Sequence, residues 1–278
     1  MTKARLWSTP ASMSKPFDPD DDPAQVAAAK AAAAKRDPLG EPDLIRAEAA
    51  TIPGEPPVPR DAATLILYRL SPEGPRILMG CRSEGHDFMP NKYVFPGGRV
   101  DDEDAGVPAI SELSPEIDQQ LQFKNTRATR AFPLTAIREV FEETGLIVGK
   151  AFSAQRSGQT VAAPPSWADY YGQGAAPCLE GFSFIGRAIT PPMRHKRFDA
   201  RFFMADAASA LIDDRPPIDG RELNDLRWFT LPEVASLDLP NVTRFVISEV
   251  EARLVRQEAA KPFYLYWAES GHVRERIG

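Results

Sequence analysis

The sequence predicts one α+β domain over residues 61–278, preceded by a largely disordered N-terminal extension. Two observations predict this class. Short apolar runs with the composition of strands are interleaved with two or three segments of helical periodicity. The chain has 278 residues and is 43% hydrophobic, which supplies enough apolar side chains for one sizeable core.

The first 60 residues differ in composition from the rest of the chain. They hold ten of the 27 prolines, an acidic cluster over residues 18–22, and an alanine- and lysine-rich run over residues 24–36. That run favours a helix by propensity, but it has no apolar stripe that would pack on a core. We therefore expect residues 1–60 to be a disordered, low-complexity extension that holds at most one loose helix.

The domain begins with a predicted β-hairpin. Residues 62–70 and 76–82 are apolar runs that flank the turn sequence SPEGP. Residues 93–95 form a short third strand that runs into the glycine pair Gly97 and Gly98. Because glycine has no side chain, this pair allows a close approach between backbone and ligand.

The elements after the glycine pair alternate between strands and helices. Residues 105–130 show no clear pattern, and we interpret them as an insertion. The other predicted elements are helices over residues 131–144 and 240–257 and strands over residues 181–189, 199–205 and 224–229.

The helix predicted over residues 131–144 has two chemically different faces. At 100° per residue, Glu139, Glu142 and Glu143 fall within an arc of about 100°. The other side carries an apolar stripe made of Leu134, Ile137, Val140 and Phe141. Gly145 follows as the expected C-cap. One face therefore packs on the core, and the other concentrates negative charge.

Such a cluster of carboxylates has a chemical explanation. Like charges on neighbouring turns repel each other by a few tenths of a kcal/mol per pair, which is on the order of a weak surface interaction. Divalent cations such as Mg²⁺ or Mn²⁺ prefer carboxylate, carbonyl and water oxygens and would offset this repulsion. The alternative is a solvated acidic helix face, which is common in soluble proteins.

The glycine pair, Asp104 and the helix together resemble the signature of the Nudix hydrolase superfamily, G-x5-E-x7-R-E-U-x-E-E-x-G-U, where U is aliphatic. The sequence REVFEETGL, from Arg138 to Leu146, matches every specified position, and Gly98 matches the first glycine. Two positions depart from the signature. Asp104 replaces the usual glutamate, and 33 residues rather than seven separate it from Arg138. Because loop-closure entropy grows slowly with length, an insertion between the two halves is tolerable if its ends stay close.

This resemblance implies a fold, an activity and a set of site residues. The fold is an α/β/α sandwich with a mixed sheet, and family members hydrolyse a nucleoside diphosphate linked to another moiety. Glu142 and Glu143 correspond to ligands of Mg²⁺ or Mn²⁺, together with a main-chain carbonyl of Gly97 or Gly98. Glu139 corresponds to a glutamate that binds metal or assists the catalytic base.

The remaining residues of the Nudix signature (the Nudix box) and one residue outside it complete this set. The resemblance implies structural roles for Gly145, for Arg138 and for Asp104, which would pair with Arg138 and orient the helix. A further acid usually lies on a loop before a tryptophan-containing strand. Glu222, six residues before Trp228, is the candidate for a catalytic base or an extra ligand. The alternative is that this loop carries only ordinary exposed acids.

Candidate substrate-binding residues come from two segments. Arg194, Lys196 and Arg197 precede a predicted strand and are candidates for binding substrate phosphates, unless they form a solvated basic loop. Arg82 begins a stretch that keeps the spacing found before the box in coenzyme A hydrolases. Asp87 and Asn91 stand where that stretch has arginine and glycine.

The long insertion and the sequence TPPMRHKRFDARFF resemble the branch of the peroxisomal and mitochondrial coenzyme A diphosphatases. This resemblance implies hydrolysis of CoA or acyl-CoA to 3′,5′-ADP and (acyl-)4′-phosphopantetheine. Hydrolysis of ADP-ribose or of a dinucleotide is an alternative. A non-catalytic Nudix ligand-binding module is a second alternative, since fold does not imply function.

The resemblance implies a small-molecule partner, a nucleoside diphosphate derivative, and the composition supports neither nucleic acid nor a membrane as a partner. A net charge of −6 gives no support to nucleic acid, and no window approaches the ~20 apolar residues of a membrane span. Two cysteines are too few for a disulfide framework, so we expect reduced thiols in a cytoplasmic protein. The sequence carries no signal of oligomeric state and leaves a homodimer open.

Overall fold

The computed structural model describes residues 55–85, 88–152, 163–268 and 271–278. Most of the extension expected over residues 1–60 lies outside the described residues, and so does Asp87. No helix in these described ranges is long and apolar enough to cross a membrane.

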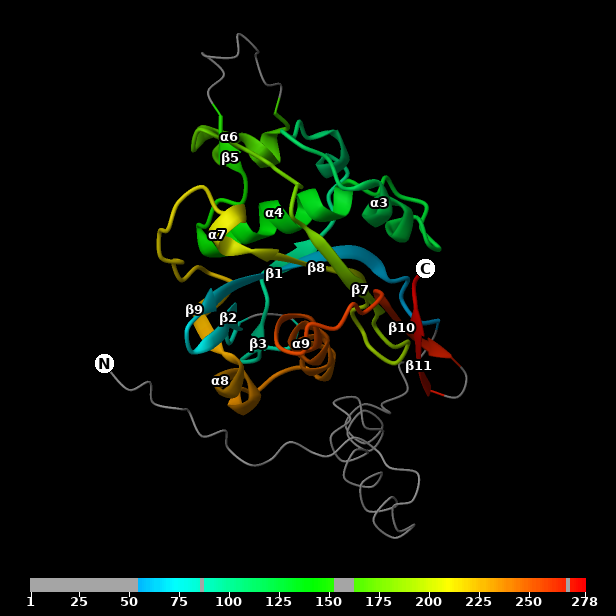
Figure 1. Cartoon of the computed structure of the whole chain (residues 1–278). Helices are drawn as coiled ribbons and strands as arrows, with labels where there is room; N and C mark the ends of the chain where they lie inside the picture. Colours follow the sequence, from blue (N-terminus) through cyan, green and yellow to red (C-terminus); the bar gives the residue numbers. More distant parts are fainter. Residues whose placement is uncertain (1–54, 86–87, 153–162, 269–270) are drawn as a thin grey trace, which may run out of the picture.

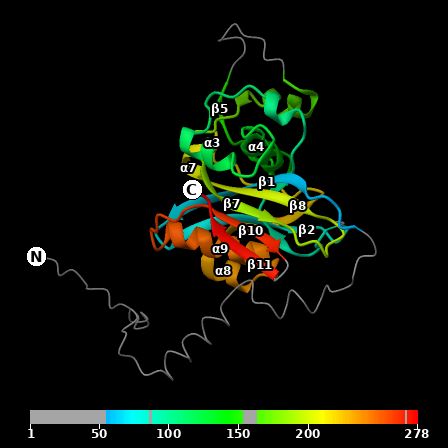
Figure 2. The same cartoon turned by 90° about the vertical axis from the view of Figure 1, so that its right-hand side faces the viewer.

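A nine-stranded mixed sheet forms the centre of the described domain (Figures 1 and 2). Its strand order is β11-β10-β7-β8-β1-β2-β3, while β4 pairs with β1 and β9 pairs with β2. The pairs β1–β8 and β7–β10 are parallel, and the others are antiparallel. The strands are β1 (Arg60–Ser71), β2 (Gly74–Arg82), β3 (Tyr93–Val94), β4 (Gly97–Arg99), β7 (Ser183–Ile189), β8 (Phe198–Asp206), β9 (Leu223–Thr230), β10 (Phe263–Ala268) and β11 (Gly271–Arg276).

The predicted hairpin and the three later predicted strands are confirmed. β1 and β2 pair from Tyr68↔Ile77 to Ser71↔Gly74. The turn requires Gly74, whose φ of 114° lies in a region that favours glycine. β7, β8 and β9 lie where strands were expected, whereas β10 and β11 are additional to the prediction.

Helices cover both faces of the sheet and give the expected α/β/α sandwich (Figures 1 and 2). One face carries α3 (Pro115–Leu121), α4 (Ala131–Thr144), α6 (Ala168–Gly172) and α7 (Ala207–Ala210). The other carries α8 (Leu231–Ser236) and α9 (Asn241–Leu254). Short 3₁₀ turns η1 (Asp104–Gly106) and η2 (Pro165–Trp167), and the small sheet of β5 (Lys150–Ala151) and β6 (Ala175–Ala176), complete the described elements.

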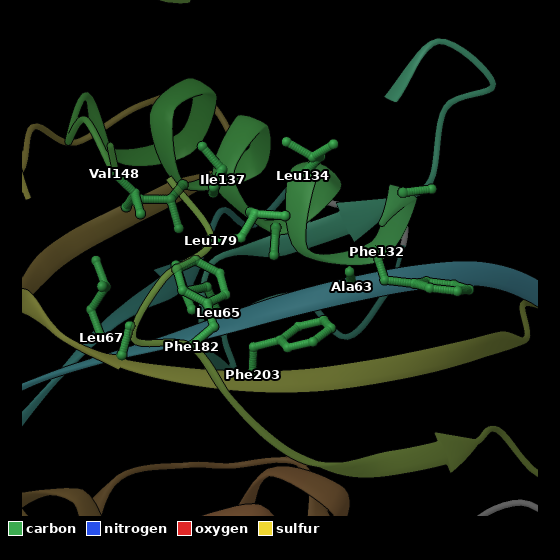
Figure 3. Packing of buried hydrophobic residues seen from close by; sticks show 14 of the residues in the cluster. Ala63, Leu65, Leu67, Phe132, Leu134, Ile137, Val148, Leu179, Phe182 and Phe203 are labelled. Atoms are coloured by element: carbon green, nitrogen blue, oxygen red, sulfur yellow. The ribbon is translucent and has the colours of Figure 1, made fainter. Parts of the chain in front are cut away.

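Successive side chains of the central strands point to opposite faces of the sheet and pack into two separate hydrophobic cores. In β1, Leu65 and Leu67 pack toward α4, and Ile66 packs toward α9. Figure 3 shows Leu65, Leu67 and Phe203 facing the apolar stripe of α4. This stripe is fully buried at Ile137 and Val140. The acidic face of α4 is therefore turned away from the core, as the periodicity predicts.

The segment over residues 105–130 connects β4 to α4. It contains α3, which the sequence analysis did not predict. Ser114 caps α3 by accepting a hydrogen bond from the backbone N–H of Ile117, and Leu121 is buried in the core beneath α4. The insertion is thus packed onto the domain and leads directly into the start of α4.

Candidate active site

A buried ion pair fixes the orientation of α4. Asp104 is completely buried, and its two carboxylate oxygens accept hydrogen bonds from Nε and Nη2 of Arg138 at 3.0 and 3.1 Å. Thr135 and Trp167 also donate to this carboxylate. Burial acts to raise the pKa of Asp104, but these hydrogen bonds outweigh it and hold the pKa below its ordinary value. The pairing implied for Asp104 and Arg138 is present.

Arg138 also reaches the acidic face of its own helix. Its Nη1 donates to Oε1 of Glu139 at 2.9 Å and to Oε2 of Glu142 at 3.1 Å. The helical projection separated Arg138 from Glu139 by about 100°, which is an angle between Cα positions. The long arginine side chain spans that angle, so the guanidinium partly neutralises the cluster.

Two carboxylates of α4 are held against the glycine pair of β4. The backbone N–H of Gly97 donates to Oε2 of Glu143 at 2.9 Å. At Gly98, any Cβ atom would overlap the carboxylate of Glu139. A side chain is therefore excluded at Gly98 because the glutamate occupies its place.

The electrostatics of this cluster favour an additional cation. Burial raises the pKa of Glu139 to about 7; Arg138 opposes this shift, and Glu142 and Glu222 add to it. Burial, together with the charge of Glu139, also raises the pKa of Glu143 well above its ordinary range. Burial thus disfavours the ionised forms of Glu139 and Glu143, and a bound cation would stabilise them.

The carboxylates do not form a closed metal cage in this structure. Within the described ranges, no group of three or more His, Cys, Asp and Glu side chains is arranged to hold a metal ion. Glu142 is half exposed and turned to Arg138, whereas Glu139 and Glu143 face β4. All three expected metal ligands nevertheless lie on one side of α4.

The loop before β9 brings Glu222 to the same site. The backbone carbonyl of Glu222 accepts a hydrogen bond from the N–H of Ser83 at 2.9 Å. Its charge contributes to the raised pKa values of Glu139 and Glu143. Asp225, within β9, accepts a hydrogen bond of 2.6 Å from the hydroxyl of Tyr93.

A cleft of about 380 Å³ lies beside β4, with Gly97 and Gly98 in its wall. Residues of β1, β7 and β8 and the first residues of α9 also line it. Three cationic residues, Arg82, Lys92 and Arg194, line the cleft, and none of its lining residues is an aspartate or glutamate. The volume falls in the range of small-molecule sites.

The structure brings two of the four predicted substrate-binding residues to this cleft. Arg82 and Arg194 line it, and Nη1 of Arg82 donates to the carbonyl of Phe88 at 2.6 Å. Arg197 does not line the cleft, because its guanidinium donates to the carbonyls of Thr190 and Pro57 and holds the edge of β8. Lys196 is also absent from the lining residues.

The sequence analysis missed polar residues that the C-terminal elements contribute to the cleft. Asn241 and Thr243 of α9 and His272 of β11 line it. They lie more than 95 residues after the box helix in the sequence. The helical periodicity of α9 was visible, but no local pattern indicated that its N-terminus opens into a cleft.

The described domain is similar to the crystal structure of a NUDIX hydrolase from Alicyclobacillus acidocaldarius. The TM-score is 0.55 at 23% identity, and the match covers 72% of this chain and 95% of that chain. The domain has the Nudix fold. The α+β class and the α/β/α sandwich with a mixed sheet are thereby confirmed.

Two further proteins are similar to parts of this chain. "Putative nudix hydrolase 7" of Caenorhabditis elegans is 30% identical over 182 residues, which cover 61% of this chain and 50% of that protein. The chain thus spans about half the length of that relative. The NUDIX domain of Shewanella oneidensis NrtR complexed with ADP ribose matches with a TM-score of 0.42 at 12% identity, covering 72% of this chain and 90% of that chain. No protein-family model matches the chain.

Proposed function

We propose that this Nudix domain hydrolyses the diphosphate bond of a nucleoside diphosphate derivative with the help of Mg²⁺ or Mn²⁺. One observation carries the proposal. The glycine pair of β4 contacts the carboxylates of Glu139 and Glu143 and also forms the wall of a cationic cleft. A diphosphate at this wall would lie between the carboxylate cluster and the cleft that holds the rest of the substrate.

The residues present fit a divalent cation. Their donor atoms are carboxylate and carbonyl oxygens, which hard cations prefer. The Glu139 carboxylate lies against Gly98, and burial raises its pKa to about 7, so a cation at this place would stabilise the ionised carboxylate. Glu139, Glu142, Glu143 and a carbonyl of the glycine pair would hold the cation, which neutralises phosphate oxygens and lowers the pKa of a bound water.

The chain's own residues supply proton transfer and positioning. Glu222 is the candidate acceptor of the proton that the attacking water loses, because it lies outside α4 and beside the cluster. Glu139, with a pKa of about 7, is the second candidate. Arg82 lies near Glu143 and Glu222 and lines the cleft, where it would bind a phosphate oxygen.

We further propose CoA or acyl-CoA as the substrate, cleaved to 3′,5′-ADP and (acyl-)4′-phosphopantetheine. The spacing from Arg82 to Gly98 supports this choice, and Arg82 lines the cleft. Asn91 replaces an expected glycine, but its φ of 60° lies in the left-handed region that asparagine and glycine favour. The backbone turn is therefore compatible with the motif. Asp87, the other departure, lies outside the described residues.

The test is hydrolysis by purified protein with Mg²⁺ or Mn²⁺ on a panel of CoA, ADP-ribose and a dinucleotide. We expect 3′,5′-ADP from CoA and a loss of turnover in Glu142→Gln and Glu143→Gln. Glu116→Gln is the matched control, because Glu116 is an exposed glutamate of α3. Release of AMP from ADP-ribose with CoA intact would reject the CoA substrate. If no diphosphate is turned over, the proposal of a hydrolase is rejected and a ligand-binding module is the function that remains.

A further inference from the structure

The N-terminus of α9 opens into the cleft without a side-chain cap. Asn241, Val242 and Thr243, the first residues of α9, line the cleft. The N-cap residue is Pro240, which has no side-chain oxygen and makes no capping hydrogen bond. The first backbone N–H groups of a helix have no partner within the helix. These donors therefore face the cleft and carry the positive end of the helix dipole.

Thr243 provides a second, independent sign of a ligand. The residue is 6% exposed, and its hydroxyl has no hydrogen-bond partner among the described residues. Every side-chain nitrogen or oxygen that is fully enclosed in the described ranges does have a partner. The Thr243 hydroxyl is therefore not sealed in the core but opens onto the cleft that the residue lines. This hydroxyl has no bond within the protein to break, so it can donate to or accept from a ligand in the cleft.

The charge of the cleft indicates the sign of that ligand. The chain has a net charge of −6, yet the cleft is lined by Arg82, Lys92 and Arg194 and by no carboxylate. Asp238, which precedes α9, is neutralised by Lys92 at 2.6 and 2.7 Å. Because Lys92 is paired with Asp238, the net positive charge of the lining comes from Arg82, Arg194 and the N-terminus of α9, and it favours an anion.

We propose that the N-terminus of α9 and the hydroxyl of Thr243 bind a phosphate monoester of the substrate that is separate from its diphosphate. This inference rests on the proposed function, which places the diphosphate at β4. The apolar lining residues Phe95 and Phe202 would contact the nucleoside. The subsite selects nucleoside diphosphate derivatives that carry an additional phosphate on the ribose.

The direct test is equilibrium binding of 3′,5′-ADP and 5′-AMP in metal-free buffer containing EDTA. Because no hydrolysis is needed, failure of the enzyme proposal and failure of this subsite give different results. We expect the wild type to bind 3′,5′-ADP at least about tenfold more tightly than 5′-AMP, as one charge-assisted contact allows. Thr243→Val should reduce this ratio, while Thr243→Ser, which keeps the hydroxyl, should preserve it.

A second variant separates binding from folding. Asn241→Asp places a negative charge at the first turn of α9, which stabilises the helix but repels a phosphate. We expect unchanged or higher thermal stability together with weaker binding of 3′,5′-ADP. Ser248→Asp, on a later turn of α9 outside the cleft lining, is the matched control. Equal wild-type affinities for the two nucleotides, or an equal loss of both in Thr243→Val, would overturn the proposal.

Discussion

Asp104 and Arg138 form a two-bond ion pair of 3.0 and 3.1 Å although 33 residues separate them in the sequence. The usual Nudix signature places seven residues between these positions. The long connection packs α3 on the domain and returns the chain to α4, so the two ends still meet. The pair ties η1 to α4 and holds the acidic face of the helix toward β4.

Replacing Asp104 with asparagine should destabilise the domain. The variant removes the fully buried carboxylate that accepts two hydrogen bonds from Arg138, and breaking a buried pair costs about 3–5 kcal/mol. Urea denaturation of Asp104→Asn measures this free energy of unfolding. Asp102→Asn is the control, because the Asp102 side chain is 96% exposed and pairs only with Arg127 among the described residues. A loss below about 1 kcal/mol for Asp104→Asn would contradict a structural role for the pair.

Gly98→Ala should abolish most activity without unfolding the protein. The added methyl group would overlap the far end of the flexible Glu139 side chain, which can move aside. Moving a catalytic or metal-binding group by about 1 Å lowers the rate roughly 100-fold. Turnover and thermal melting, measured on the same preparation, separate these two effects.

Gly172→Ala is the matched control for this variant. Nothing lies within 4 Å of a Cβ atom at Gly172, which ends α6 at the surface. The control should keep wild-type turnover. If Gly98→Ala is as active as the control, the contact between β4 and Glu139 has no part in catalysis.

The two acids before Trp228 should differ in their effect on turnover. Glu222→Gln removes the candidate base and should lower kcat by about 10²–10⁴-fold, the usual contribution of such a group. Asp225→Asn should change kcat by less than about threefold, since asparagine tolerates the Asp225 φ of 49° and still accepts from Tyr93. Steady-state kinetics of the two variants measure this contrast. If Glu222→Gln keeps the wild-type kcat, Glu222 is not the catalytic base and Glu139 becomes the candidate.

The local features of the site could be predicted from the sequence, but the cleft could not. The 3.6-residue period of α4 determines which side of the helix carries Glu139, Glu142 and Glu143. Gly145 ends the helix with a φ of 71°, as expected of a C-cap glycine. The cleft instead combines β1, β4, β7, β8 and α9, and its composition depends on long-range pairing that no sequence window contains.

Arg197 shows the limit of charge patterns most clearly. The cluster over residues 194–197 is basic throughout, but only Arg194 lines the cleft. The Arg197 guanidinium instead donates hydrogen bonds to the carbonyls of Thr190 and Pro57. Which side chain of a basic loop meets a ligand depends on the backbone path. Residues 263–268, by contrast, carry an aromatic run typical of a strand, and the prediction omitted β10.

Stability in acid should depend on Glu249. Its carboxylate is buried on α9 and accepts hydrogen bonds from Arg276 at 2.7 Å and from Arg253 at 2.9 Å. Burial acts to raise the pKa of Glu249, but the arginines outweigh it and hold the pKa below its ordinary value. The stabilisation is therefore present above the unfolded pKa of about 4.3 and is lost as the pH falls through the folded value.

Glu249→Gln should lower the free energy of unfolding at pH 7 by about 2–3 kcal/mol, the contribution of hydrogen bonds to a charged group. The difference between the wild type and the variant should shrink as the pH falls below about 4. Thermal melting from pH 3 to pH 7 measures both curves. A constant difference across this range would show that the Glu249 charge is not responsible.

We propose that the glutamates of α4 hold a divalent cation against β4. Titration of the metal-free protein with Mn²⁺, followed by electron paramagnetic resonance with a diphosphate nucleotide present, measures the free cation directly. We predict uptake by the wild type and an affinity at least about tenfold lower in Glu143→Gln. A wild type that takes up no Mn²⁺, or a variant that binds it equally well, would contradict the claim.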